Sequence, residues 1–104
     1  MAKLFFVGSS LEDIRSFPKA AREKIGYDLH RVENGLDPQD WKPMQTIGRG
    51  VREIRIRDAS GAYGVIYVTT IGTSVYVLHA FNKKAQKTSQ RDIDLAKQRL
   101  KDIT

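Results

Sequence analysis

Six cations are the side chains of this chain best suited to chemistry, and they lie towards the two ends of a β-rich stretch, residues 48–88. They are Arg52, Arg55 and Arg57 in its first strand-like run, and Lys83, Lys84 and Lys87 after its last. Guanidinium and ammonium groups attract polyanions and can stabilise the charge that builds up on a phosphate during phosphodiester cleavage. The cations therefore predict a surface for a nucleic acid or another polyanion.

Cleavage of RNA at such a surface would also require proton transfer. The 2′-hydroxyl must lose a proton and the leaving 5′-oxygen must gain one. A lysine whose pKa is depressed by neighbouring positive charges could take part, and the cluster Lys83-Lys84-x-x-Lys87 offers one. Simple phosphate binding without cleavage is equally compatible with these residue types.

Three strand-like runs position these cations: residues 51–57, 63–69 and 75–81. Turn residues at 58–61 and 72–74 separate them, which predicts an antiparallel meander. Alternation in the first run puts Ile54 and Ile56 on one face and Glu53, Arg55 and Arg57 on the other. We expect the first face to pack under helices and the second to present charge to a ligand. The alternative is an ordinary solvated face on which Glu53 neutralises a neighbour.

The remaining segments predict an α+β fold in a single domain, residues 1–104. We expect a strand at residues 3–7, a short helix from Leu11, and a longer helix at 19–34 that ends at Gly35. The two helices would form a hairpin over one face of a mainly antiparallel sheet. Residues 35–46 read as a loop, in which Trp41 either closes the edge of the core or offers a platform for a base. Ser89 predicts the start of a C-terminal helix.

Composition narrows the class of protein. The 104 residues carry 18 Lys+Arg against 12 Asp+Glu, a formal charge of +6, which favours an acidic partner. No apolar run approaches the roughly 18 residues of a membrane span, so we expect no membrane association. The absence of cysteine fits a reducing compartment, and we expect a cytoplasmic protein. With only His30 and His79 as histidines, the sequence predicts neither a metal site nor a cofactor.

His79 lies within the apolar third run. It reads either as a half-buried histidine whose ring is hydrogen-bonded or as an acid/base group. The neighbouring run contains Gly64, which is unusual because a glycine inside a central strand weakens it and leaves a gap on one face.

Taken together, the motifs resemble the RelE/HigB toxins, and most of all their phage-related, HigB-like branch. The matching pattern is a strand, a helix hairpin and a Trp-Lys loop, followed by GxGVREIRIRD, GAYxVIYV, VYVLHAFxKKxxKT and DIxLAxxR. It covers residues 4–100, and the segment AFNKKAQKT is its most specific part. The resemblance implies a microbial-RNase-like α/β fold and a type II toxin–antitoxin pair, with a small antitoxin that is often a helix-turn-helix protein. It also implies metal-independent cleavage of messenger RNA on the ribosome, which inhibits translation.

Site residues follow from the resemblance position by position. Arg55 and Arg57 would be cations of the cleavage face, and Lys83 and Lys84 would act on the phosphate side. Further RNA contacts would come from Arg52, Tyr63, Lys87 and Arg91.

Two departures from the pattern bear on activity. GAYxVIYV usually carries arginine at x, facing the scissile phosphate, whereas this chain has Gly64. Loss of a cation there would cost roughly 3–4 kcal/mol of transition-state stabilisation by analogy with a lost oxyanion donor, so we expect an attenuated enzyme or a non-catalytic binder of RNA or antitoxin. Some relatives place a catalytic tyrosine or histidine after the basic segment, where this chain has Thr88, Ser89 and Gln90. Lys84 and His79 are then the candidates for proton transfer.

Overall fold

The computed structural model describes residues 1–69 and 73–104, and five strands form one sheet within them. The elements are β1 (Lys3–Phe6), α1 (Ser10–Arg15), α2 (Lys19–Glu33), β2 (Trp41–Pro43), β3 (Val51–Asp58), β4 (Gly61–Val68), β5 (Ser74–Lys83) and α3 (Gln90–Ile103). The strand order is β1-β5-β4-β3-β2; β1 runs parallel to β5, and every other pair is antiparallel. The predicted α+β fold with a mainly antiparallel sheet is confirmed.

The meander forms as predicted, although part of one predicted turn, Gly72, lies outside the described residues. The turn between β3 and β4 is stabilised locally: Asp58 Oδ1 accepts hydrogen bonds from the Ser60 backbone N–H (2.7 Å) and hydroxyl (2.6 Å). Gly61 follows at φ +145°, a conformation that glycine adopts without a steric penalty. The β3–β4 hairpin therefore has a fixed register in which Arg55 faces Gly64.

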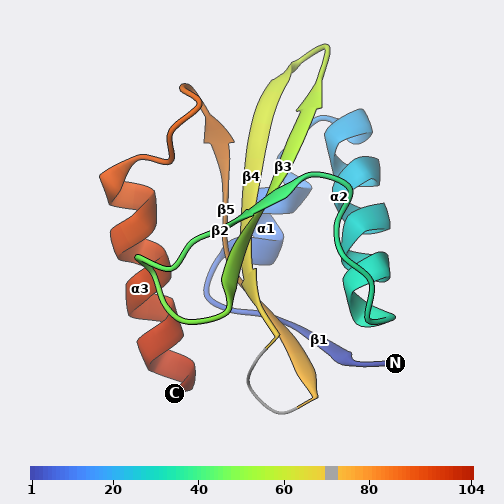
Figure 1. Ribbon diagram of the computed structural model, residues 1–104. Helices are drawn as coiled ribbons and strands as arrows, with labels where there is room; N and C mark the ends of the chain where they lie inside the picture. Colours follow the sequence, from blue (N-terminus) through green and yellow to red (C-terminus); the bar gives the residue numbers. More distant parts are fainter. Residues whose placement is uncertain (70–72) are drawn as a thin grey trace.

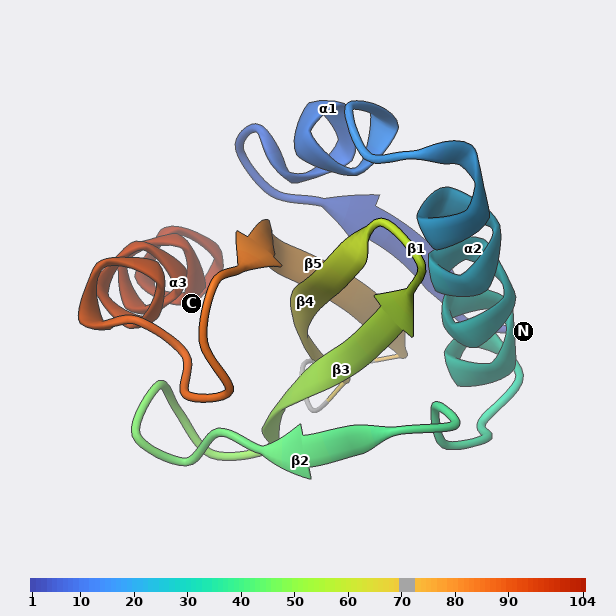
Figure 2. The same cartoon turned by 90° about the horizontal axis from the view of Figure 1, so that it is seen from above.

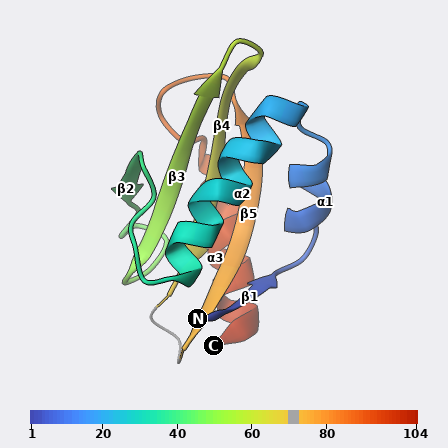
Figure 3. The same cartoon turned by 90° about the vertical axis from the view of Figure 1, so that its right-hand side faces the viewer.

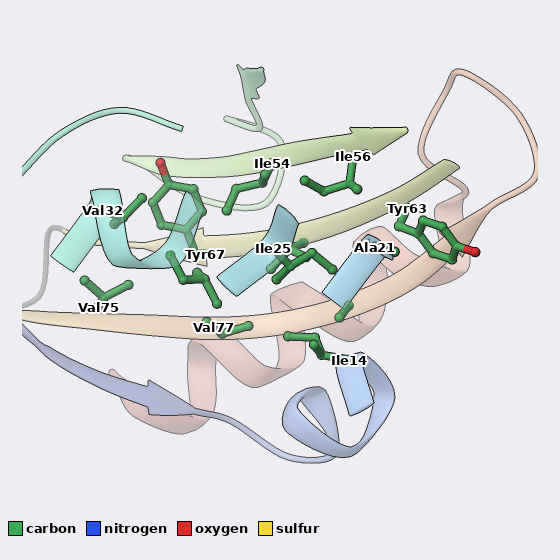
Figure 4. Close-up of a cluster of buried hydrophobic side chains, with 13 residues drawn as sticks. Ile14, Ala21, Ile25, Val32, Ile54, Ile56, Tyr63, Tyr67, Val75 and Val77 are labelled. Carbon is green, nitrogen blue, oxygen red and sulfur yellow. The ribbon is translucent and has the colours of Figure 1, made fainter. Parts of the chain in front are cut away.

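Helices cover both faces of the sheet. Figure 1 shows α2 to the right of the central strands, α1 behind them and α3 to the left, and Figure 2 shows the same arrangement from above; Figure 3 turns α1 and α2 towards the viewer, with α3 behind the sheet. The larger apolar cluster lies under α1 and α2, where Ile25 and Leu29 pack against β3, β4 and β5 (Figure 4). A second cluster lies under α3, where Ala96 packs with Ile66, Leu78 and other apolar residues. The sheet is thus the middle of three layers.

Local signals set the helix ends. Gly35 has φ +78°, and the bonds Gly35 N–H to Val32 O and Leu36 N–H to Arg31 O close a Schellman motif after α2. Ser89 caps α3, because its hydroxyl accepts the Asp92 N–H at 3.2 Å. Both predicted helix ends are confirmed.

Two expectations about the framework were wrong. Residues 35–46 are not all loop, because β2 forms within them and pairs with β3 as an edge strand. The face of β3 that carries Glu53 is not open to solvent along its length, because Val51 packs with residues of α3 and Glu53 is buried. Arg99 donates to Leu78 O and to the Ser9 hydroxyl, both at 3.0 Å, and so ties α3 to β5 and to the segment after β1.

No helix in the described part of the chain combines the length and the apolar character that crossing a membrane requires.

Candidate functional site

A cleft of about 740 Å³ lies where β3 and β5 leave the helix-covered part of the sheet. Its walls come from three places: the start of β2, the β3–β4 hairpin, and the loop after β5. The lining residues are Asp40, Lys42, Arg55, Ile56, Arg57, Ala62, Tyr63, Lys83, Lys84, Ala85, Gln86 and Lys87. Six of them are cationic, so segments that are distant in sequence bring positive charge to one concave surface.

Strand register explains this convergence. Arg57 faces Ala62 across the β3–β4 pair, and Ala62 faces Lys83 across the β4–β5 pair. Opposite residues on neighbouring strands project from the same face of a sheet. Arg55, two positions along from Arg57, belongs to this face as well.

The two arginines differ in their partners. Arg55 Nη2 lies 2.7 Å from Asp40 Oδ1 in a salt bridge, and its side chain is 44% exposed. Arg57 is exposed, and no ion pair to it occurs among the described residues. Arg57 therefore offers its charge directly to a ligand, whereas Arg55 is held in place by a carboxylate at the cleft wall.

The Lys83 side chain is buried and is not exposed to a ligand in the cleft. Its Nζ lies 2.7 Å from Glu53 Oε2, and the side chains of Lys83 and Glu53 are only 6% and 0% exposed. The other carboxylate oxygen of Glu53 accepts a hydrogen bond from the Thr88 hydroxyl. This cluster, Glu53–Lys83–Thr88, joins β3, the end of β5 and the residue just before the cap of α3.

Lys84 and Lys87 lie in the loop that the cluster brackets. Both are exposed and both line the cleft. Because Lys83 and Thr88 fix the ends of the loop, the two free ammonium groups are carried on a short, anchored segment.

Gly64 has a close neighbour. It faces Arg55 on β3 and Phe81 on β5, and a Cβ atom built at Gly64 would lie 2.5 Å from Cζ of the Phe81 ring. The ring thus fills the space that a side chain at position 64 would need. The gap that the sequence predicts on one face at Gly64 is therefore absent, because the Phe81 ring fills that space.

His79 lies outside the first cleft, below the start of α3. Its Nε2 is 2.7 Å from Asp92 Oδ1, and its ring stacks on Phe81 with centroids 5.2 Å apart. A third cleft of about 410 Å³ includes His79, Asp92 and the exposed Arg91, and it shares Lys83, Lys84 and Lys87 with the first. Of the two readings of His79, the structure shows the buried, hydrogen-bonded histidine.

Arg52 lies outside the first cleft, and Tyr63 lines this cleft without exposing its ring. Arg52 pairs with Asp37 at 2.8 Å, a hydrogen bond that raises the arginine pKa, and its guanidinium lies 3.8 Å from the centroid of the Trp41 ring. The Tyr63 side chain is buried at 2% exposure, with its ring against Phe17. Neither side chain presents an open face to RNA, and Arg52 covers one face of Trp41.

Several residues of the site had no clear signal in the sequence. Asp40 and Lys42 lie in a stretch that reads as loop, and Thr88 reads only as a neighbour of the Ser89 cap. Glu53 reads as an exposed neutralising residue, because alternation gives its face but not what covers that face. No group of three or more histidine, acidic or cysteine residues suited to a metal ion occurs in the described part of the chain.

Comparison with known proteins connects this site to a family. The model of the phage-derived Gp49-like proteins matches residues 12–101. The chain belongs to the Gp49-like family. The match spans α2, the whole meander and most of α3, so it includes every residue that lines the first cleft. A comparison with curated protein sequences finds no match.

Solved structures extend the comparison of this Gp49-like chain at the level of the fold. A double alanine variant of the E. coli toxin RelE in the free state matches with a TM-score of 0.65 at 17% identity, over 100% of both chains. The isolated E. coli RelE toxin matches with a TM-score of 0.58 at 17% identity, again over 100% of both chains. In the intact E. coli RelBE toxin–antitoxin complex, the match has a TM-score of 0.62 at 17% identity and covers 82% of this chain and 100% of that one. The predicted RelE-type fold in a phage-related branch is confirmed.

Proposed function

We propose that this protein is the toxin of a type II toxin–antitoxin pair and cleaves messenger RNA on the ribosome without a metal ion. The observation that carries the proposal is the convergence of Arg55, Arg57, Lys84 and Lys87 on one cleft. The family match and the RelE fold support it, and a complex of RelE with its antitoxin is among the structural matches.

In the proposed reaction, the 2′-hydroxyl oxygen attacks the adjacent phosphorus while the bond to the 5′-oxygen of the next nucleotide breaks. Arg57 and Lys87 stabilise the negative charge that accumulates on the phosphate oxygens. Arg55, held by Asp40, orients the ribose-phosphate chain. Lys84 is our candidate for proton transfer, because Lys83 is paired with Glu53 and His79 with Asp92. Its amine would accept the proton of the 2′-hydroxyl and return it to the leaving 5′-oxygen, so that the upstream nucleotide ends in a 2′,3′-cyclic phosphate.

The partner would be an acidic segment of the cognate antitoxin, of the helix-turn-helix kind that the sequence resemblance suggests. Opposite charge would guide it to the cleft and exclude RNA. The ribosome and messenger RNA would be the remaining partners.

Gly64 favours a second candidate function, a non-catalytic member of the family that binds RNA or antitoxin. The family's usual arginine is absent, and the Phe81 ring occupies its space. An enzyme lacking that charge would be slower by about 10²–10³-fold, by analogy with lost oxyanion donors.

The test is cleavage in a translation extract, read by primer extension on the message. We expect weak, codon-phased breaks with the natural chain and none with Arg57→Ala. Gly64→Arg combined with Phe81→Leu, which makes room for the new side chain, should increase the breaks strongly. If neither the natural chain nor the Gly64→Arg, Phe81→Leu variant yields breaks, but both bind RNA in a salt-dependent way, the non-catalytic function is correct.

A further inference from the structure

A second cleft, of about 650 Å³, lies beside the first and on the other side of Lys87. One wall is the turn after β2, and the other is the segment that leads into α3; Figure 2 shows these two segments facing each other below the sheet. The lining residues are Lys42, Pro43, Met44, Gln45, Thr46, Lys87, Thr88, Gln90, Ile93 and Lys97. Its volume is in the range of small-ligand sites.

The lining suits an unstacked nucleobase. Met44 and Ile93 belong to the apolar packing under α3 and provide a nonpolar wall. Gln45, Thr46 and Gln90 are exposed around it and carry amide and hydroxyl groups. Proteins recognise single-stranded RNA by packing the faces of splayed bases and hydrogen-bonding their edges.

The charges suit the backbone of the same nucleotide. Lys42, Lys87 and Lys97 line the second cleft, and none of its lining residues is acidic. The third cleft includes Asp92 and a fourth includes Asp94, so of these three clefts the second is the one without a carboxylate in its lining.

The second cleft adjoins the first. Lys42 and Lys87 line both of them. A strand whose scissile phosphate lies in the first cleft can therefore pass between two ammonium groups into the second without leaving positive surface.

We propose that the second cleft is a base-recognition subsite, which holds the nucleotide next to the scissile linkage and reads its base with Gln45 and Gln90. The proposal rests on the proposed function, since it assumes that RNA occupies the first cleft. It assigns sequence preference to residues that take no part in bond cleavage.

The test uses labelled full-length protein, amide NMR spectra and non-cleavable single-stranded RNAs carrying 2′-O-methyl groups, two or five nucleotides long. We expect the dinucleotide to shift amide signals of the first cleft, at Arg57 and Ala62. The pentanucleotide should also shift those of Gln45, Thr46 and Ile93 and should bind more tightly. Gln45→Ala with Gln90→Ala should weaken pentanucleotide binding by roughly fivefold, the effect of about one lost hydrogen bond, and leave the dinucleotide unaffected.

Gln98→Ala is the matched control, because Gln98 is on α3 but lines only the fourth of these clefts. It should change neither affinity. If the pentanucleotide shifts only the first cleft and binds no more tightly than the dinucleotide, the subsite proposal is overturned and the proposed function stands. If neither RNA shifts either cleft, both fail.

Discussion

At the scale of single residues, Gly64 and Phe81 share one space on the sheet. A Cβ at position 64 would collide with the ring, so Gly64→Ala should lower the free energy of unfolding by about 1–3 kcal/mol, as overpacked substitutions do. In a Phe81→Ala background the same change should be neutral or stabilising. Urea unfolding of the natural protein, the two single variants and the double variant measures the coupling free energy between positions 64 and 81.

Gly26→Ala provides the control for this cycle. Gly26 lies inside α2, and a Cβ there meets nothing within 4 Å. This substitution should stabilise the protein by about 0.5–1 kcal/mol, the usual gain of alanine over glycine in a helix. Additive effects of Gly64→Ala and Phe81→Ala would show that the ring does not require the glycine.

Asp28 is a second residue whose effect on stability can be measured, because its buried carboxylate should lower the free energy of unfolding. Its side chain is buried in α2 at 2% exposure, and burial raises its pKa even though Oδ1 accepts the Gln39 N–H at 3.1 Å. A raised pKa in the folded state means that the ionised carboxylate destabilises the protein at neutral pH. Asp28→Asn should therefore raise the melting temperature at pH 7, since the amide oxygen can still accept the Gln39 hydrogen bond.

The gain should depend on pH. Below the ordinary aspartate pKa of about 3.9, the natural side chain is protonated in both folded and unfolded states, so the gain should vanish. It should grow as the pH rises above that value and be complete above the raised pKa of the folded state. Glu23→Gln, an exposed change on the same helix, is the control; an equal gain at pH 3 and pH 7 for Asp28→Asn would contradict the desolvation argument.

At the scale of elements, the Glu53–Lys83–Thr88 cluster fixes the loop that carries Lys84 and Lys87. Removal of one member of a buried ion pair costs about 3–5 kcal/mol, whereas replacement of both by apolar residues is often neutral. Glu53→Leu should therefore destabilise the protein strongly, and Glu53→Leu with Lys83→Met should restore most of the loss. Chemical denaturation of the single and double variants measures this.

Cleavage separates the structural role of this pair from a chemical one. If Lys83 only anchors the loop, the restored double variant should retain activity in the translation extract. A stable double variant with no activity would show that Lys83 itself acts on the RNA.

These elements also show what the sequence could and could not predict. The turn at 58–61, Gly35 and Ser89 act through local hydrogen bonds and backbone geometry, so their outcomes were predictable. The burial of Glu53 was not predictable, because its partners Lys83 and Thr88 lie 30 and 35 residues away in the chain. Tyr63 begins a run that is apolar on both faces of the strand. Such a run does not indicate whether the Tyr63 ring packs in the core or is exposed.

The candidate site was predictable only in part, because some of its residues are placed by contacts between distant segments. Clustered cations identified the cleft, and the structure brings Arg55, Arg57, Lys84 and Lys87 together. Arg52 was misplaced because neighbouring positions on a strand project from opposite faces. Asp40 and Lys42 were missed because β2 is only three residues long and ends in proline.

At the scale of the whole molecule, the excess positive charge should appear as a salt dependence of RNA binding. Each phosphate contact with single-stranded RNA contributes about 0.7 to the slope of log affinity against log salt. Arg57→Ala or Lys87→Ala should each reduce the slope by about that amount. Fluorescence anisotropy over a salt series measures it.

Lys3→Ala removes the same charge from β1, at the edge of the sheet opposite β2. It should leave the slope unchanged. An equal loss for all three variants would mean that net charge, rather than the cleft, attracts the RNA.

The parallel pairing of β1 with β5 has a consequence for how the chain is made. Synthesis releases Lys3–Phe6 first, but its hydrogen-bonding partners, residues 74–77, emerge some 70 residues later. Arg99 reaches the Ser9 hydroxyl later still. A nascent chain therefore cannot pair β1 with β5 until residues 74–77 have been synthesised, and it gains the contact between Arg99 and Ser9 only after residue 99.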